Sequence, residues 1–154
     1  MKGFFSLSTP GDLFHKLESD FERVREDPKD VYAAFDFCVT AWHLVDWTFP
    51  DTKSPERAAM LRRHPILRAC EHLAVGAKHF EPNSDRHNSV SSTADTSVWG
   101  HGVWGKGVWG AKVWSGELSV RLDGEAKEAL GASLLFQGFA EKVLATWREE
   151  LSRE

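Results

Sequence analysis

The chain has 154 residues, of which 42% are hydrophobic and 27% are charged, and its formal net charge is −4. This length fits one domain, residues 1–154, and the composition excludes intrinsic disorder as the default state. The negative balance disfavours a nucleic-acid binder that relies on bulk positive charge, although it leaves a local basic patch open.

Cysteine usage and the start of the chain indicate a compartment. Cys38 and Cys70 stand in apolar helical contexts, where reduced and buried thiols are usual. They imply no disulfide framework, which favours a reducing cytoplasm. The opening stretch, MKGFFSLSTPGD, lacks an apolar run long enough for a signal peptide. We therefore expect a cytoplasmic protein.

The longest apolar run, residues 31–49, approaches membrane-spanning length, but it contains Asp36, His43 and Asp46. Each ionisable group costs about 2–3 kcal/mol at the centre of a bilayer. The run therefore predicts a buried core helix and no membrane partner.

Three predicted helices begin with an N-cap residue followed by proline, at Thr9-Pro10, Asp27-Pro28 and Ser54-Pro55. Asp12 and Asp30 occupy the third helical position, where a carboxylate suits the positive end of the helix. Apolar periodicity predicts helices over residues 10–26, 28–48, 55–80 with a kink or break at Pro65, and 124–152 with Asp123 as N-cap. The second helix is apolar nearly all round, which is typical of the centre of a bundle.

Between the third and fourth helices the composition changes twice. Residues 81–97 are rich in Ser, Asn and Asp and are predicted as a loop. A repeat of period five follows, with its tryptophans at Trp99, Trp104, Trp109 and Trp114. An odd period would place successive Trp side chains on opposite faces of one strand, so a two-stranded ribbon, about residues 97–109 against 112–122, is the simplest solution.

The predicted fold is therefore mainly α, α+β at the margin: a four-helix bundle with a Trp-rich β-ribbon inserted between helices 3 and 4. A ribbon of this kind covers a face of the bundle or forms a dimer interface, and exposed aromatic arrays also stack on sugars, bases or planar drugs. Only His101, Lys106 and Lys112 add positive charge inside the repeat, which disfavours nucleic acid. We expect a homodimer formed through the ribbon.

Polar residues gather on the second and third predicted helices. Asp46 lies one turn from His43, between Trp42 and Trp47, and His72 and His79 lie two turns apart on one side of the next helix. Lys78 is on an adjacent stripe, and Gly76 leaves room for close approach by a backbone or a ligand. If the two helices are antiparallel neighbours, His43 and Asp46 meet His72 or His79.

Three interpretations of this His/Asp cluster stay open. The first is a satisfied hydrogen bond that fixes helix register, because an unpaired buried polar group costs on the order of 1–3 kcal/mol. The second is a metal site, which lacks the close HxxxH or ExxH spacing, so no metal is expected. The third is a general acid/base pair at a pocket, with His43, Asp46 and His79 as catalytic candidates.

Arg57 and His64 resemble the Arg-(four to six)-His motif of HEPN-type ribonucleases, which are also small helical bundles. Here the pair precedes Pro65, and Ala58 stands where that family has a polar residue after the arginine. No phosphate loop, nucleophile elbow or zinc cysteine cluster occurs in the sequence.

Three segments together, Ala41-Trp42-His43-Leu44-Val45-Asp46-Trp47, Ala77-Lys78-His79-Phe80 and the late Trp147, resemble a set of uncharacterised small helical bacterial proteins with WHLxDW and AKHF motifs. Some of these proteins are carried on mobile elements such as integron gene cassettes. The resemblance implies the helical fold and the interest of His43, Asp46, Lys78 and His79, but no reaction.

The leading expectation is a non-enzymatic, oligomeric binding protein without a cofactor. It takes a partner or a small aromatic or polar ligand, and the alternative is a nuclease or hydrolase, either HEPN-like or His/Asp acid-base. The sequence does not decide whether the protein is an enzyme. The residues expected to bind are Trp42, Trp47, His72, Lys78, Trp99, Trp104, Trp109 and Trp114.

Overall fold

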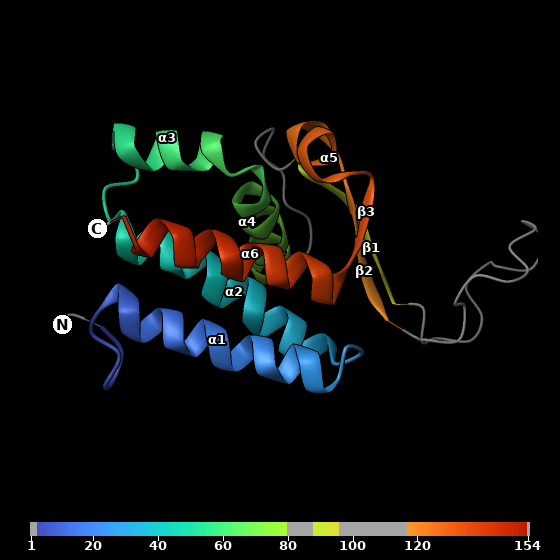
Figure 1. Ribbon diagram of the computed structural model, residues 1–154, viewed down its shortest axis with the longest axis horizontal. Helices are drawn as coiled ribbons and strands as arrows, with labels where there is room; N and C mark the ends of the chain where they lie inside the picture. Colours follow the sequence, from blue (N-terminus) through green and yellow to red (C-terminus); the bar gives the residue numbers. More distant parts are fainter. Residues whose placement is uncertain (1–2, 80–87, 96–116, 154) are drawn as a thin grey trace, which may run out of the picture.

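The computed structural model describes residues 3–79, 88–95 and 117–153, which form six helices and one three-stranded antiparallel sheet (Figure 1). The predicted mainly helical fold is confirmed. Four helices were predicted, and the two further helices arise from the predicted break at Pro65 and from an unpredicted division of the last helix. The elements are α1 (Pro10–Glu26), α2 (Val31–Thr48), α3 (Pro55–Arg63), α4 (Pro65–Lys78), β1 (Val90–Asp95), β2 (Leu118–Leu122), α5 (Gly124–Leu130), β3 (Ser133–Leu135) and α6 (Phe136–Leu151).

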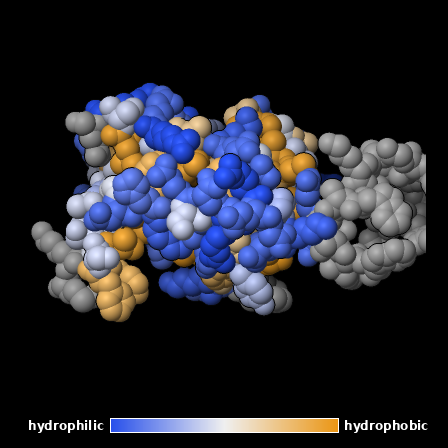
Figure 2. All heavy atoms as spheres, turned by 60° about the horizontal axis from the view of Figure 1, so that its bottom comes forward, coloured by the Kyte–Doolittle hydropathy of each residue, from blue (hydrophilic) through white to orange (hydrophobic). Residues whose placement is uncertain are grey.

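The first helix begins and ends where the sequence predicts. Thr9 caps α1: its hydroxyl accepts a hydrogen bond from the Asp12 N–H at 3.1 Å, and its own N–H donates to the Asp12 carboxylate at 2.9 Å. Hydrogen bonds from the Ser8 backbone and from the Thr9 side chain and backbone lower the pKa of Asp12 to about 2. The outward side of α1 belongs to the mainly hydrophilic face in Figure 2, while Leu17 and Val24 are buried.

The second helix begins later than predicted, at Val31, because Asp30 is its N-cap and accepts hydrogen bonds from the N–H groups of Tyr32 and Ala33. Asp27 is instead the C-cap of α1. α2 packs against α1, α4 and α6. One side of its first turns is nevertheless exposed, at Val31, Tyr32 and Phe35, so the prediction of a helix at the centre of a bundle is wrong there.

The predicted break at Pro65 is confirmed. α3 ends at Arg63 and α4 begins at Pro65, with His64 between them in a non-helical conformation at φ −124° and ψ 79°. A residue before proline is pushed out of the helical region by the proline ring, and the ring nitrogen has no N–H to donate. His64 is therefore held at a corner between two helices.

The predicted helix over residues 124–152 is wrong, although Asp123 does cap its start by accepting a hydrogen bond from the Gly124 N–H. α5 ends at Leu130, and its C-cap is Gly131, whose φ of +95° is available mainly to glycine. The chain then adds β3 to the sheet before α6 begins. A single uninterrupted helix cannot contain this backbone conformation.

The sheet has the order β1-β2-β3. β1 lies inside the segment predicted as a loop and pairs with β2, so that Asp95 faces Leu118. β2 lies within the predicted second ribbon strand, residues 112–122, and buries every second residue: Leu118, Val120 and Leu122. The predicted first ribbon strand, residues 97–109, and the four tryptophans of the repeat lie outside the described residues.

One continuous hydrophobic core draws on α1 to α6 and β2. Trp147 is fully buried in it, and the rings of Phe37 and Phe136 meet edge to face at 6.1 Å. Cys38 and Cys70 are free and buried, as predicted, and burial raises the pKa of the Cys38 thiol to about 12. Among the described helices, none has the length and apolar character that crossing a membrane requires.

Candidate functional site

The predicted acid/base residues of α2 do not meet those of the next helix. His43 is exposed, and Asp46, which is 44% exposed, forms an ion pair with Arg57 at 2.8 Å. His79 and Lys78 are exposed at the end of α4. No group of three or more His, Cys, Asp or Glu side chains within residues 3–79, 88–95 and 117–153 is arranged to hold a metal ion.

His72 is engaged with the sheet. Its Nδ1 atom accepts a hydrogen bond from the Val90 N–H at 3.1 Å. This bond ties α4 to the first residue of β1, so His72 has a structural role between the helix and the sheet. The Cβ position of Gly76, one turn further on, has no atom within 4 Å, so no close approach explains that glycine among the described residues.

The buried Arg57 joins α3 to the end of α2. Besides the Asp46 ion pair, it donates a hydrogen bond to the Phe49 carbonyl at 3.1 Å, and its guanidinium lies 5.2 Å from the centre of the Trp42 ring. His64 instead contacts α6, through Glu150. The two residues of the HEPN-like pair are therefore turned to different helices.

Trp42 and Trp47 are only partly buried and pack against the hydrophobic core. Trp42 also supplies the face on which Arg57 lies. These contacts hold the end of α2 in place, so both side chains have structural roles whatever else they bind.

An unpredicted feature is a group of exposed apolar side chains at the start of α2, which we call the α2 apolar surface: Val31 (51% exposed), Tyr32 (81%) and Phe35 (48%). The spacing i, i+1, i+4 places them on one side of the helix. The sequence did not reveal this surface because its residues belong to the same apolar run as the buried part of α2.

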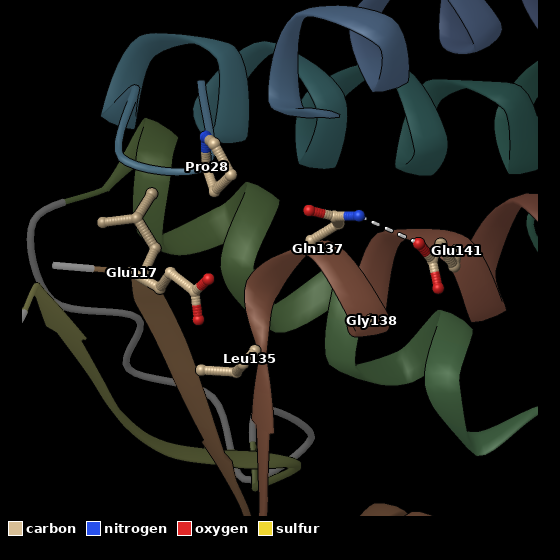
Figure 3. A pocket seen from close by; sticks show the side chains of 7 residues that line it. Pro28, Glu117, Leu135, Gln137, Gly138 and Glu141 are labelled. Carbon is tan, nitrogen blue, oxygen red and sulfur yellow. Dashed lines mark hydrogen bonds between the residues drawn. The ribbon is translucent and has the colours of Figure 1, made fainter. Parts of the chain in front are cut away.

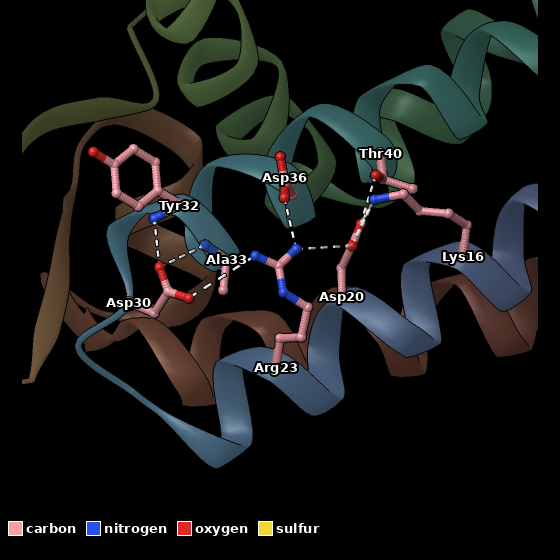
Figure 4. Close-up of polar contacts among 8 residues, drawn as sticks. All are labelled: Lys16, Asp20, Arg23, Asp30, Tyr32, Ala33, Asp36 and Thr40. Atoms are coloured by element: carbon pink, nitrogen blue, oxygen red, sulfur yellow. Dashed lines mark hydrogen bonds and ion pairs between the residues drawn. The ribbon is translucent and has the colours of Figure 1, made fainter.

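A polar network fixes the position of this surface (Figure 4). Arg23 of α1 bonds the Asp36 carboxylate at 2.6 Å and also approaches Asp30, the N-cap of α2, at 3.9 Å. One turn earlier on α1, the buried Asp20 accepts a hydrogen bond from the Thr40 hydroxyl at 2.7 Å. These contacts hold residues 30–40, which begin at the N-cap of α2, against α1, so the apolar side chains are presented on a helix that is fixed to its neighbour.

A shallow cleft of about 270 Å³ lies beside the start of α2, between Pro28, β2 and the first turns of α6 (Figure 3). Pro28, Leu118 and Leu135 give it apolar walls, while Glu117 and Glu141 give it negative charge. Gln137 bonds Glu141 at 3.1 Å, and the Leu118 N–H donates to the Pro28 carbonyl at 3.4 Å, which joins β2 to the chain just before α2.

No protein-family model, curated protein or solved structure matches the chain. The resemblance to small bacterial proteins of mobile elements stays a prediction.

Proposed function

We propose that the protein is a non-enzymatic interaction protein that forms a homodimer through the α2 apolar surface and the tryptophan repeat. The observation that carries the proposal is the exposure of Val31, Tyr32 and Phe35 together on a helix whose other face forms the core. Single exposed apolar residues are ordinary, but contiguous groups of them on a rigid element commonly mark contact surfaces.

The position of the repeat in the chain supports this pairing. Residues 96–116 connect Asp95, the last residue of β1, to Glu117, the residue before β2. Asp95 faces Leu118 in the sheet. Leu118 bonds Pro28, three residues before the α2 apolar surface begins. The two ends of the repeat segment are therefore attached beside the α2 apolar surface.

The chemistry of the two parts is complementary. Residues 96–116 contain four Trp, two Lys and no Asp or Glu, whereas the cleft beside the α2 apolar surface carries Glu117 and Glu141. Four tryptophans bury about 600–1,000 Å², close to the roughly 800 Å² that each partner contributes to a stable interface. A two-fold dimer uses the repeat and the surface of both copies.

The test is the molar mass of the full chain by light scattering at about 50 µM, well above a micromolar Kd. We expect a dimer. Tyr32→Ser combined with Phe35→Ser, and separately Trp104→Ser combined with Trp109→Ser, weaken association by about tenfold or more, because buried aromatic anchors dominate interface energy.

Phe5→Ser is the matched control, since Phe5 is also an exposed aromatic residue, at 94%, but lies outside the proposed contact. It leaves the dimer intact. A wild-type monomer at this concentration, or equal weakening by Phe5→Ser, contradicts the proposal. Unchanged circular dichroism in each variant shows that the fold is retained.

A further inference from the structure

A second cleft, of about 350 Å³, lies at the corner between α3 and α4, where it faces α5 and α6. Its polar lining includes Arg63, His64, Lys142 and Thr146. Its apolar lining includes Ile66 and Leu130. No Asp or Glu is among its lining residues, although the whole chain has a net charge of −4. The cleft therefore combines a cationic part with an apolar part.

Glu150, which is 9% exposed, holds two of these side chains in place. One of its oxygens lies 2.9 Å from His64 Nε2, and the other accepts a hydrogen bond from Arg63 Nη2 at 2.7 Å. Arg63 lines the cleft, and one N–H of its guanidinium donates to Glu150. Within the part of the chain that the structure describes, no hydrogen bond occupies its other N–H groups.

Lys142 supplies the second cation from α6. Its side chain is exposed, and in the described ranges its ammonium group forms no ion pair with any carboxylate. The Arg63 charge is paired with Glu150 at 2.7 Å, so Lys142 is the cleft cation that has no carboxylate partner among the described residues. Charge-assisted hydrogen bonds from arginine and lysine are the usual means of holding an oxyanion.

We propose that this cleft binds a small organic anion, with an oxyanion group at Arg63 and Lys142 and an apolar body against Ile66 and Leu130. Phosphate monoesters and carboxylates share this chemistry. The volume is at the lower end of the range for small-molecule sites, about 300–1,000 Å³, and suits a ligand with one aromatic ring. The site lies on other elements than the α2 apolar surface and is independent of dimer formation.

The test is titration calorimetry of the full chain with phenyl phosphate, benzoate, inorganic phosphate and benzyl alcohol. Phenyl phosphate or benzoate binds saturably, and whichever is tighter identifies the oxyanion. Inorganic phosphate, which lacks the apolar body, and benzyl alcohol, which lacks the charge, each bind at least about tenfold more weakly. No saturable binding of any probe up to about 10 mM overturns the proposal.

Lys142→Gln is the decisive variant, because Lys142 forms no ion pair among the described residues and its loss leaves the fold intact. It weakens binding of the tighter probe about tenfold, as does Arg63→Gln, whose folding is checked by thermal melting. Lys53→Gln, in the exposed loop before α3, is the control and leaves affinity unchanged. Equal affinity of Lys142→Gln and the wild type refutes the assignment.

Discussion

The carboxylate of Asp20 is almost completely buried between α1 and α2, so it depends on its partners there. It is 2% exposed and accepts hydrogen bonds from the Thr40 hydroxyl at 2.7 Å and from the Lys16 ammonium at 2.5 Å. Thr40→Val keeps the shape but removes one donor, and we expect the free energy of unfolding to fall by about 1–2 kcal/mol. Thr40→Ser retains the hydroxyl and costs less than about 1 kcal/mol. Urea denaturation measures both, and equal stability of Thr40→Val and wild type contradicts this role.

At the scale of the elements, local signals predicted some boundaries and long-range pairing decided the others. The capping of α1 and the break at Pro65 depend on neighbouring residues alone, and the sequence shows both. β1 was missed because residues 91–95 are all exposed, so its polar sequence carries no alternation. The division of the last predicted helix was missed because residues 133–135 become a strand only by pairing with β2.

Gly131 is the residue that makes this division possible, because it ends α5 with φ at +95°. Gly131→Ala is expected to lower the free energy of unfolding by about 1–3 kcal/mol, since a Cβ atom strains this conformation although no neighbouring atom lies within 4 Å. Thermal or urea unfolding measures the loss.

Gly76→Ala is the matched control, because Gly76 is inside α4 and its Cβ position is also free of neighbours within 4 Å. There alanine is the better helix former, and we expect a gain of up to about 1 kcal/mol. A stabilising Gly131→Ala substitution would show that the helix runs on past residue 131 in solution.

At the scale of the whole molecule, the candidate sites depend on contacts between distant segments, which helix periodicity cannot supply. A polar stripe on α2 shows that His43 and Asp46 share a side, but not whether that side meets another helix or solvent. The partner of His64 is 86 residues away, at Glu150, and no local pattern connects them. The α2 apolar surface was missed because the sequence alone does not distinguish exposed from buried apolar residues of one helix.

Glu150 connects the end of α6 to the corner between α3 and α4, so it joins distant parts of the chain. Burial opposes its ionisation, but hydrogen bonds from His64 and Arg63 hold the pKa of Glu150 below the ordinary 4.5. Glu150→Gln removes this charge while keeping the shape. We expect the free energy of unfolding at neutral pH to fall by about 1–3 kcal/mol, the usual range for hydrogen bonds to a charged group.

The same change has a predictable dependence on pH. Because the pKa of Glu150 is lower in the folded than in the unfolded protein, its stabilising contribution is complete above about pH 4.5 and is lost as the pH falls through the folded-state pKa. The difference between wild type and Glu150→Gln, measured by urea denaturation, is therefore largest near neutral pH and shrinks in acid. Glu149→Gln, the exposed neighbour that pairs only with Arg153 in the described chain, changes stability by less than about 0.5 kcal/mol. A Glu150→Gln deficit that stays constant from pH 7 to acid would show that the residue acts by packing rather than by charge.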